Sequence, residues 1–233
     1  MSETFLHFTK QGAGPPLLLL HGNGEDGSYF VNQMSAFSLH YTVYAIDTRG
    51  HGLSPRGDAP FTIGQFAQDL LKFMDEERIE KANLLGFSDG GNIALTFALT
   101  HRNRVDRLIL NGANLDPSGV KLSVQIPIVI GYWIASLFAR FSPKAKRHAE
   151  MLRLMVKEPH IKPESLKKLY IPTLVIVGTR DMIKDAHTLT IASALPCARM
   201  EMIVGDHFIA AKNPDEFNEA VAAFLADTRS DIL

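Results

Sequence analysis

The sequence contains little cysteine and no excess of charge of either sign. Its 233 residues include one cysteine, Cys197, so no disulfide can form within the chain, which fits a reducing compartment. Lys and Arg number 24 against 25 Asp and Glu, and this balance argues against a nucleic-acid-binding protein that relies on positive charge. With 46% hydrophobic and 21% charged residues, the composition is typical of a folded globular domain.

Segments that would target the chain or anchor it in a membrane are also scarce. The first residues lack a basic stretch followed by an apolar one, so we expect no signal peptide and a cytoplasmic protein. Residues 122–139 form 18 uncharged positions, near the lower limit for a spanning helix. However, Pro127 interrupts this stretch, and a span would divide the strands of one predicted sheet. We therefore expect a buried or cap helix, with an interfacial helix as the alternative, and no transmembrane span.

Short apolar runs alternate with helical patterns along most of the chain. The strand-like runs are residues 16–21, 41–46, 82–87, 107–110, 172–177 and 199–204, with one more expected at residues 4–9. The helical patterns are residues 62–77, 90–100, 185–194 and 214–226. This alternation predicts an α/β fold whose mostly parallel sheet, of about seven strands, is covered by helices on both faces.

The alternation stops over residues 113–171, which are too long for an ordinary loop. We predict a helical cap insertion there, between two strands of a core built from residues 1–112 and 172–233. Residues 140–168 contain nine Lys or Arg against three acids, so this part carries +6 and the remainder of the chain −7. A basic surface of this kind either attracts anionic substrates or membranes or is simply a solvated helical face.

One motif indicates a catalytic nucleophile. Residues 86–90 read Gly-Phe-Ser-Asp-Gly, which matches G-x-S-x-G, between a strand-like and a helix-like segment. A serine on such a tight turn projects its hydroxyl clear of the backbone, and the flanking glycines relieve crowding between strand and helix. The sequence therefore predicts Ser88 as a nucleophile.

A serine hydroxyl needs a base, and the base needs an acid to orient it. His207 follows the last strand-like run, and Asp181 follows the one before it. Because the carboxyl ends of parallel strands meet at one edge of the sheet, both are expected beside Ser88. We predict His207 as the base and Asp181 as its partner, in preference to the adjacent and more constrained Asp206.

A developing oxyanion needs two preorganised donors. The backbone N–H of Asp89, directly after the nucleophile, is the first candidate. The glycine-containing loop after the first apolar strand, residues 21–24, supplies the second, for which we nominate the N–H of Asn23.

Taken in order, these segments resemble the α/β-hydrolase fold superfamily over nearly the whole chain. The matching pieces are residues 21–24, the Asp-Thr-Arg-Gly-His-Gly-Leu-Ser segment at 47–54, the Ser88 turn, Asp181 and His207. The resemblance implies that Asp47 and Arg49 support loops under the active site. The chain departs from the family in lacking one N-terminal strand.

The resemblance implies a serine hydrolase that acts through an acyl-enzyme, but it does not specify the substrate. Because the cap is short, we expect small to medium carboxylic esters or thioesters. Carbon–carbon bond hydrolysis on the same triad and a ligand-binding receptor on a hydrolase scaffold are the alternatives. We expect a small-molecule ester as the partner, no nucleic acid, no cofactor and, because no H-E-x-x-H-like spacing is present, no metal.

Two sequence features suggest how substrate is bound. The Ser-Asp-Gly-Gly turn resembles that of hydrolases acting on amino-acid esters, in which an acid such as Asp89 attracts an ammonium group; alternatively, Asp89 only supports the helix start. The apolar side chains of the cap either line an acyl pocket or form the core of the cap. From them we predict Trp133 and Phe138 as substrate-binding residues.

Overall fold

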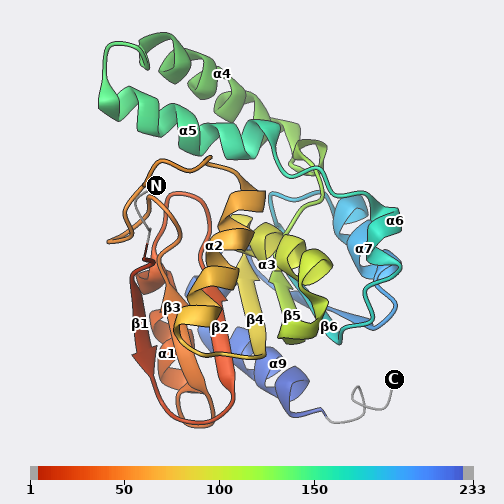
Figure 1. Cartoon of the computed structure of the whole chain (residues 1–233). Helices are drawn as coiled ribbons and strands as arrows, with labels where there is room; N and C mark the ends of the chain where they lie inside the picture. The colour runs from red at the N-terminus through yellow and green to blue at the C-terminus, as the bar shows by residue number, and fades with distance from the viewer. Residues whose placement is uncertain (1–4, 228–233) are drawn as a thin grey trace.

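The computed structural model describes residues 5–227 and shows a sheet of seven strands with helices on both faces (Figure 1). The strands are β1 (Phe8–Gln11), β2 (Pro16–Leu20), β3 (Thr42–Ile46), β4 (Ala82–Phe87), β5 (Val105–Asn111), β6 (Thr173–Gly178) and β7 (Ala198–Ile203). They lie in the order β1-β3-β2-β4-β5-β6-β7, and every pair is parallel except β1 with β3. The predicted α/β class and strand number are confirmed.

The first strand begins later than the sequence predicts. The prediction placed it at residues 4–9, of which residue 4 lies outside the described part, whereas β1 covers Phe8–Gln11. Three of its four side chains are exposed, because β1 is an edge strand. Its position is therefore set by pairing with β3, not by an apolar pattern of its own.

The nine helices of residues 5–227 cover the sheet or extend from it. They are α1 (Val31–Phe37), α2 (Ile63–Glu76), α3 (Asp89–Thr100), α4 (Leu122–Phe138), α5 (Pro143–Lys157), α6 (Pro163–Leu166), α7 (Asp185–Ala194), α8 (Ile209–Lys212) and α9 (Pro214–Ala226). Short 3-10 turns lie at Gly27–Phe30, Arg102–Arg104 and Pro117–Gly119. None of these helices combines the length and the apolar character that crossing a bilayer requires.

Side chains alternate between two cores because successive residues of a strand point to opposite faces. On β2, Leu18 and Leu20 belong to the core that includes residues of α2, α3 and α7, whereas Leu17 and Leu19 belong to the core that includes residues of α1, α8 and α9. Both faces are buried, which explains why the strands read as continuous apolar runs.

Two features of this fold position the site. The strand order reverses between β2 and β4: after β2 the chain adds β3 on one side, and then β4 is added on the other side of β2. The loops after β2 and β4 therefore leave the sheet on opposite faces beside one another, at a topological switch point. Helices α4, α5 and α6 lie between β5 and β6, and the α4–α5 hairpin projects from the body beyond the loops (Figure 1).

Candidate active site

Ser88 lies on a strained turn between β4 and α3. Its backbone has φ 53° and ψ −119°, a region that residues other than glycine adopt only when surrounding structure imposes it, at a cost of about 1–3 kcal/mol. The turn also brings backbones into close approach: a Cβ on Gly90 would lie 1.9 Å from the carbonyl oxygen of Leu20. Only glycine fits there, so the motif packs the N-terminus of α3 against the end of β2.

His207 and Asp181 form a buried pair. The Nδ1 atom of His207 lies 2.7 Å from Oδ1 of Asp181, and the residues are 3% and 1% exposed. The same Oδ1 accepts the backbone N–H of Ile183 at 2.8 Å, and the ammonium of Lys121 donates to the Asp181 carbonyl at 2.6 Å. Asp206, in contrast, pairs with Lys212 at the surface.

The end of β5 connects this pair to Ser88. The backbone N–H of Ser88 donates to the carbonyl of Asn111 at 2.8 Å, and the next residue, Gly112, lies directly under the imidazole of His207. The ring of Phe87 also packs on His207, with centroids 4.8 Å apart. Among the described residues Nε2 of His207 has no hydrogen-bond partner, so it is the nitrogen available to a hydroxyl.

The loop after β2 faces the start of α3. In this loop Gly22 and Glu25 close a turn by two hydrogen bonds, from the Glu25 N–H to the Gly22 carbonyl and from the Gly22 N–H to the Glu25 carboxylate. The side-chain amide of Asn23 donates to the Met151 carbonyl of α5 at 2.7 Å. Because the first N–H groups of a helix have no partner within it, the Asp89 N–H is available at the positive end of α3.

Two polar side chains, those of Asp47 and His21, support the loop after β2 through hydrogen bonds to its backbone. Asp47 accepts the N–H of Gly27 at 2.7 Å and that of Leu53 at 2.8 Å, so it ties two loops together. The ring of His21 accepts the Thr48 N–H at Nε2, which leaves Nδ1 to donate to the Gly22 carbonyl. Burial lowers the pKa of His21 to about 4, so this ring stays neutral and serves as a fixed spacer.

Two carboxyl groups of the site have raised pKa values. Burial raises the pKa of Glu25 to about 7 and that of Asp89 to about 6. Asp89 is 7% exposed; its Oδ1 accepts the side-chain amide of Asn92, while Oδ2 has no partner among the described residues. Perturbed carboxyl groups beside a strained serine are typical of functional sites.

Comparison with known proteins identifies the family. The family model described as the alpha/beta hydrolase fold matches residues 15–132, half of the chain. The chain belongs to the α/β-hydrolase family.

Relatives within the family differ in what they are named for. A protein from Caulobacter sp. (strain K31), provisionally named carbamate hydrolase RutD, is 28% identical, with 90% of each chain covered. The crystal structure of the enol-lactonase from Burkholderia xenovorans LB400 is 25% identical, with a TM-score of 0.81 and 96% and 97% of the two chains covered. A meta-cleavage product hydrolase from Pseudomonas fluorescens IP01 shares the fold, with a TM-score of 0.78 at 23% identity, and 95% and 94% of the chains covered.

Two residues at the α/β-hydrolase site were missing from the sequence prediction. Gly112 has φ +64° and carries the His207 ring; the Asn-Gly pair at the end of β5 is a turn signal that could have indicated it. Glu25 bears no such signal, because only the fold buries it against Gly22.

The two predicted substrate-binding residues of the insertion have exposed side chains on α4. Trp133 is 65% exposed and Phe138 is 52% exposed, both on the outer side of α4. Their contact with substrate stays a prediction. Within residues 5–227, no group of three His, Cys, Asp or Glu side chains is arranged to hold a metal ion.

Proposed function

We propose that this α/β-hydrolase is a serine hydrolase that cleaves small to medium carboxylic esters or thioesters through an acyl-enzyme. The observation that carries the proposal is the buried hydrogen bond between His207 and Asp181. The imidazole of His207 rests on Gly112, and the preceding residue, Asn111, accepts the backbone N–H of Ser88. This arrangement supplies a nucleophile, a base with a free nitrogen, and an acid that fixes the tautomer of the base.

In the proposed mechanism, the Ser88 oxygen attacks the ester carbonyl carbon while His207 Nε2 takes the hydroxyl proton. Asp181 stabilises the imidazolium, and the N–H groups of Asn23 and Asp89 hold the oxyanion. Collapse of the tetrahedral intermediate breaks the ester bond, and the leaving alcohol takes the proton from His207. Water then attacks the acyl-enzyme by the same proton route, releasing the acid and restoring Ser88.

We further propose that residues 113–171 act as the cap over a core of residues 1–112 and 172–233. A cavity of about 320 Å³ lies between α5 and the loop at residues 50–61. Its lining combines the apolar side chains of Phe61 and Met151 with the polar side chains of Arg56, Lys144, Arg147, His148 and Glu150. Met151 also contacts the loop that carries Asn23, so this cavity borders the proposed oxyanion site. Its size is at the low end for ligand pockets, which favours small and medium acyl groups.

Carbamate cleavage is the second candidate, because the Caulobacter relative with that name aligns over 90% of the chain. A carbamate carbonyl can be attacked by the same serine, giving a carbamoyl-enzyme in place of an acyl-enzyme. The likeness to the meta-cleavage product hydrolase, at 23% identity, concerns the fold alone, so carbon–carbon cleavage ranks below both.

The decisive experiment combines covalent labelling with a substrate panel. A fluorophosphonate should modify Ser88 stoichiometrically, as located by peptide mass spectrometry. Ser88→Ala should lower kcat/KM for p-nitrophenyl esters by at least about 10³-fold without changing the melting temperature. Ser193→Ala, on the exposed face of α7, is the matched control and should retain full activity.

The panel separates the candidates. Graded p-nitrophenyl esters, the corresponding thioesters and an aryl carbamate are compared at equal concentration. Preference for the carbamate would replace the ester proposal with the second candidate. Absence of turnover and of fluorophosphonate labelling in the folded protein would refute both and favour a receptor.

A further inference from the structure

The outer side of α4 is an apolar surface that nothing in the described protein covers. We define the outer face of α4 as Ile126, Ile130, Trp133, Ile134, Leu137 and Phe138. Each is more than half exposed, and their spacing places them on one side of the helix. The combined exposed area is on the order of 600 Å², which is at the upper end for the largest apolar patch of a monomeric protein, and such patches are often functional.

The opposite side of α4 is occupied by α5. The side-chain amide of Gln125 donates to the Met155 carbonyl at 3.2 Å, and Gly131 lies against Leu152. Ala135 is the single buried hydrophobic side chain of α4. Because the hairpin projects from the body, its outer face meets solvent and no part of residues 5–227 folds back over it (Figure 1).

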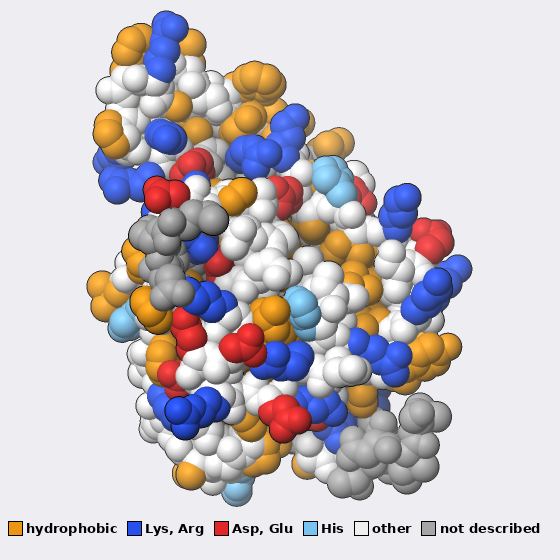
Figure 2. Space-filling view, viewed as in Figure 1, with side chains coloured by type: hydrophobic (Ala, Val, Ile, Leu, Met, Phe, Trp, Pro, Cys, Tyr) orange, Lys and Arg blue, Asp and Glu red, His pale blue; other side chains and the backbone are white. Residues whose placement is uncertain are grey.

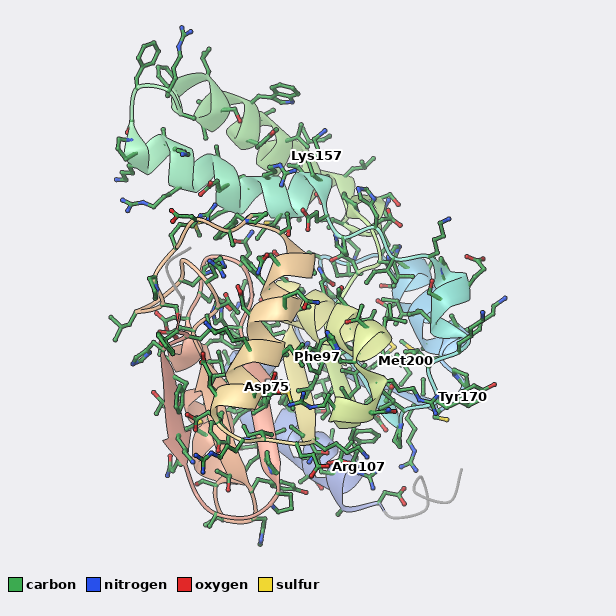
Figure 3. The ribbon with its side chains drawn as sticks, viewed as in Figure 1. Asp75, Phe97, Arg107, Lys157, Tyr170 and Met200 are labelled. Atoms are coloured by element: carbon green, nitrogen blue, oxygen red, sulfur yellow. The ribbon has the colours of Figure 1, made fainter. Side chains whose placement is uncertain are left out.

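Positive charge lies on the same hairpin, at the C-terminal end of α4 and along α5. Residues 140–168 carry nine Lys or Arg against three acids, and Arg140, Lys144, Lys146 and Lys157 are exposed on the hairpin. In Figure 2 the projecting hairpin shows apolar atoms together with Lys and Arg atoms at its tip and along its underside. Lys157, labelled in Figure 3, marks the place where α5 returns toward the body.

This combination decides between two occupants. A second copy of the chain docked through α4 would bring together two hairpins that each carry six Lys or Arg against one acid in residues 122–157, at a cost in repulsion. An anionic lipid surface would instead attract them, with about 1 kcal/mol for each Lys or Arg near the surface. An indole such as that of Trp133 is also the side chain preferred at the level of the lipid headgroups.

We propose that the outer face of α4 binds the surface of an anionic membrane. The helix lies in the plane of the interface with its apolar side chains at the boundary between headgroups and acyl chains, while the Lys and Arg side chains of the hairpin extend to lipid phosphates. The protein does not span the bilayer. Membrane binding by this surface does not depend on the chemistry proposed for Ser88, His207 and Asp181.

The chain provides its own probe, because Trp133 is the single tryptophan of the sequence and lies within the outer face. Full-length protein is titrated with vesicles of phosphatidylcholine alone or of phosphatidylcholine and phosphatidylglycerol in equal parts. Tryptophan emission should shift to the blue with the mixed vesicles, the protein should float with them, and both effects should weaken as salt rises.

Two variants and one control variant test the assignment. Ile130→Ser/Leu137→Ser should weaken binding to the mixed vesicles at least tenfold, with unchanged melting temperature and unchanged hydrolysis of a water-soluble ester. Leu39→Ser/Leu189→Ser, which removes two exposed leucines elsewhere, should bind as the wild type does. Arg140→Gln/Lys146→Gln/Lys157→Gln should reduce the salt dependence.

Other results would overturn the proposal. A blue shift that depends on protein concentration in the absence of vesicles, with a dimer in sedimentation, would assign the face to a second copy. Equal binding to neutral and anionic vesicles, or no binding to either, would also refute it. Since activity on a water-soluble ester is measured in parallel, failure of membrane binding and failure of the proposed hydrolase function are distinguishable.

Discussion

Gly112→Ala provides a stringent test of the proposed triad, because it perturbs the geometry without removing a catalytic group. A Cβ at this position would lie 2.6 Å from Cε1 and 2.8 Å from Nδ1 of His207, and 3.4 Å from Oδ2 of Asp181. Relative to an ordinary contact of 3.4 Å, the ring must move by about 0.8 Å. Since Gly112 also has φ +64°, alanine adds about 1–2 kcal/mol of backbone strain.

A displacement of this size should reduce catalysis strongly. Misplacement of a reacting group by about 1 Å can cost on the order of 10²-fold, because the imidazole no longer aligns with both its acid and the hydroxyl. We therefore expect Gly112→Ala to lower kcat for p-nitrophenyl butyrate about 100-fold. KM should change little, and fluorophosphonate labelling of Ser88 should slow in parallel with kcat.

Two other glycines control for folding. Gly12→Ala, where φ is +82° and a Cβ would meet the Ser38 carbonyl at 2.3 Å, should destabilise the protein but leave kcat of the folded fraction unchanged. Gly64→Ala, on α2 with open space around it, should be neutral or slightly stabilising. If Gly112→Ala retained wild-type kcat below its melting temperature, His207 would not be the base in the position described.

Three further predictions concern charge. Burial raises the pKa of Glu25 from 4.5 to about 7, so the folded protein keeps a proton between these values that the unfolded chain releases, and stability falls as pH rises through this window. Glu25→Gln should therefore melt at a higher temperature than the wild type at pH 8 and at a similar one at pH 4; a difference independent of pH would contradict this. Asp69→Asn breaks the buried ion pair with Arg49 and should lower the free energy of unfolding in urea by about 3 kcal/mol or more. Asp106→Asn, in an exposed pair with Lys81, should lower it by less than about 1 kcal/mol. Equal losses in the two variants would contradict this prediction. If Asp89 binds an ammonium group, Asp89→Asn should lower kcat/KM about tenfold for an α-amino ester but not for its deaminated analogue, and an equal effect on both would rule this out.

Most of the sheet could be predicted because its strands are buried on both faces. The runs at residues 16–21 and 172–177 are continuous and apolar, and β2 and β6 lie there within a residue or two. The edge strand β1 was misplaced because its polar side chains carry no such signal. Register at the edge is a property of pairing with β3.

The candidate site was predictable to the extent that its residues follow strands. Ser88, Asp181 and His207 each lie just beyond the carboxyl end of a strand, and a parallel sheet brings those ends to one edge. The Asn-Gly pair indicates a turn at Gly112, but the contact of Gly112 with His207 and the burial of Glu25 depend on the fold, which local sequence patterns do not encode. The strands bring these residues to the same edge of the sheet, whereas the loops determine the distances between their side chains.

The α4 segment shows a different limit of sequence reasoning. Hydropathy measures the preference of a segment for leaving water, but it does not specify which apolar medium receives it. The uncharged run at residues 122–139 is compatible with a core, an interface or a bilayer, and periodicity alone cannot separate them. The structure adds that α5 occupies one side only and that the hairpin projects beyond the body. With the sheet already covered by other helices, the second apolar side of α4 stays exposed within residues 5–227, and the partner that we propose for it is a membrane surface.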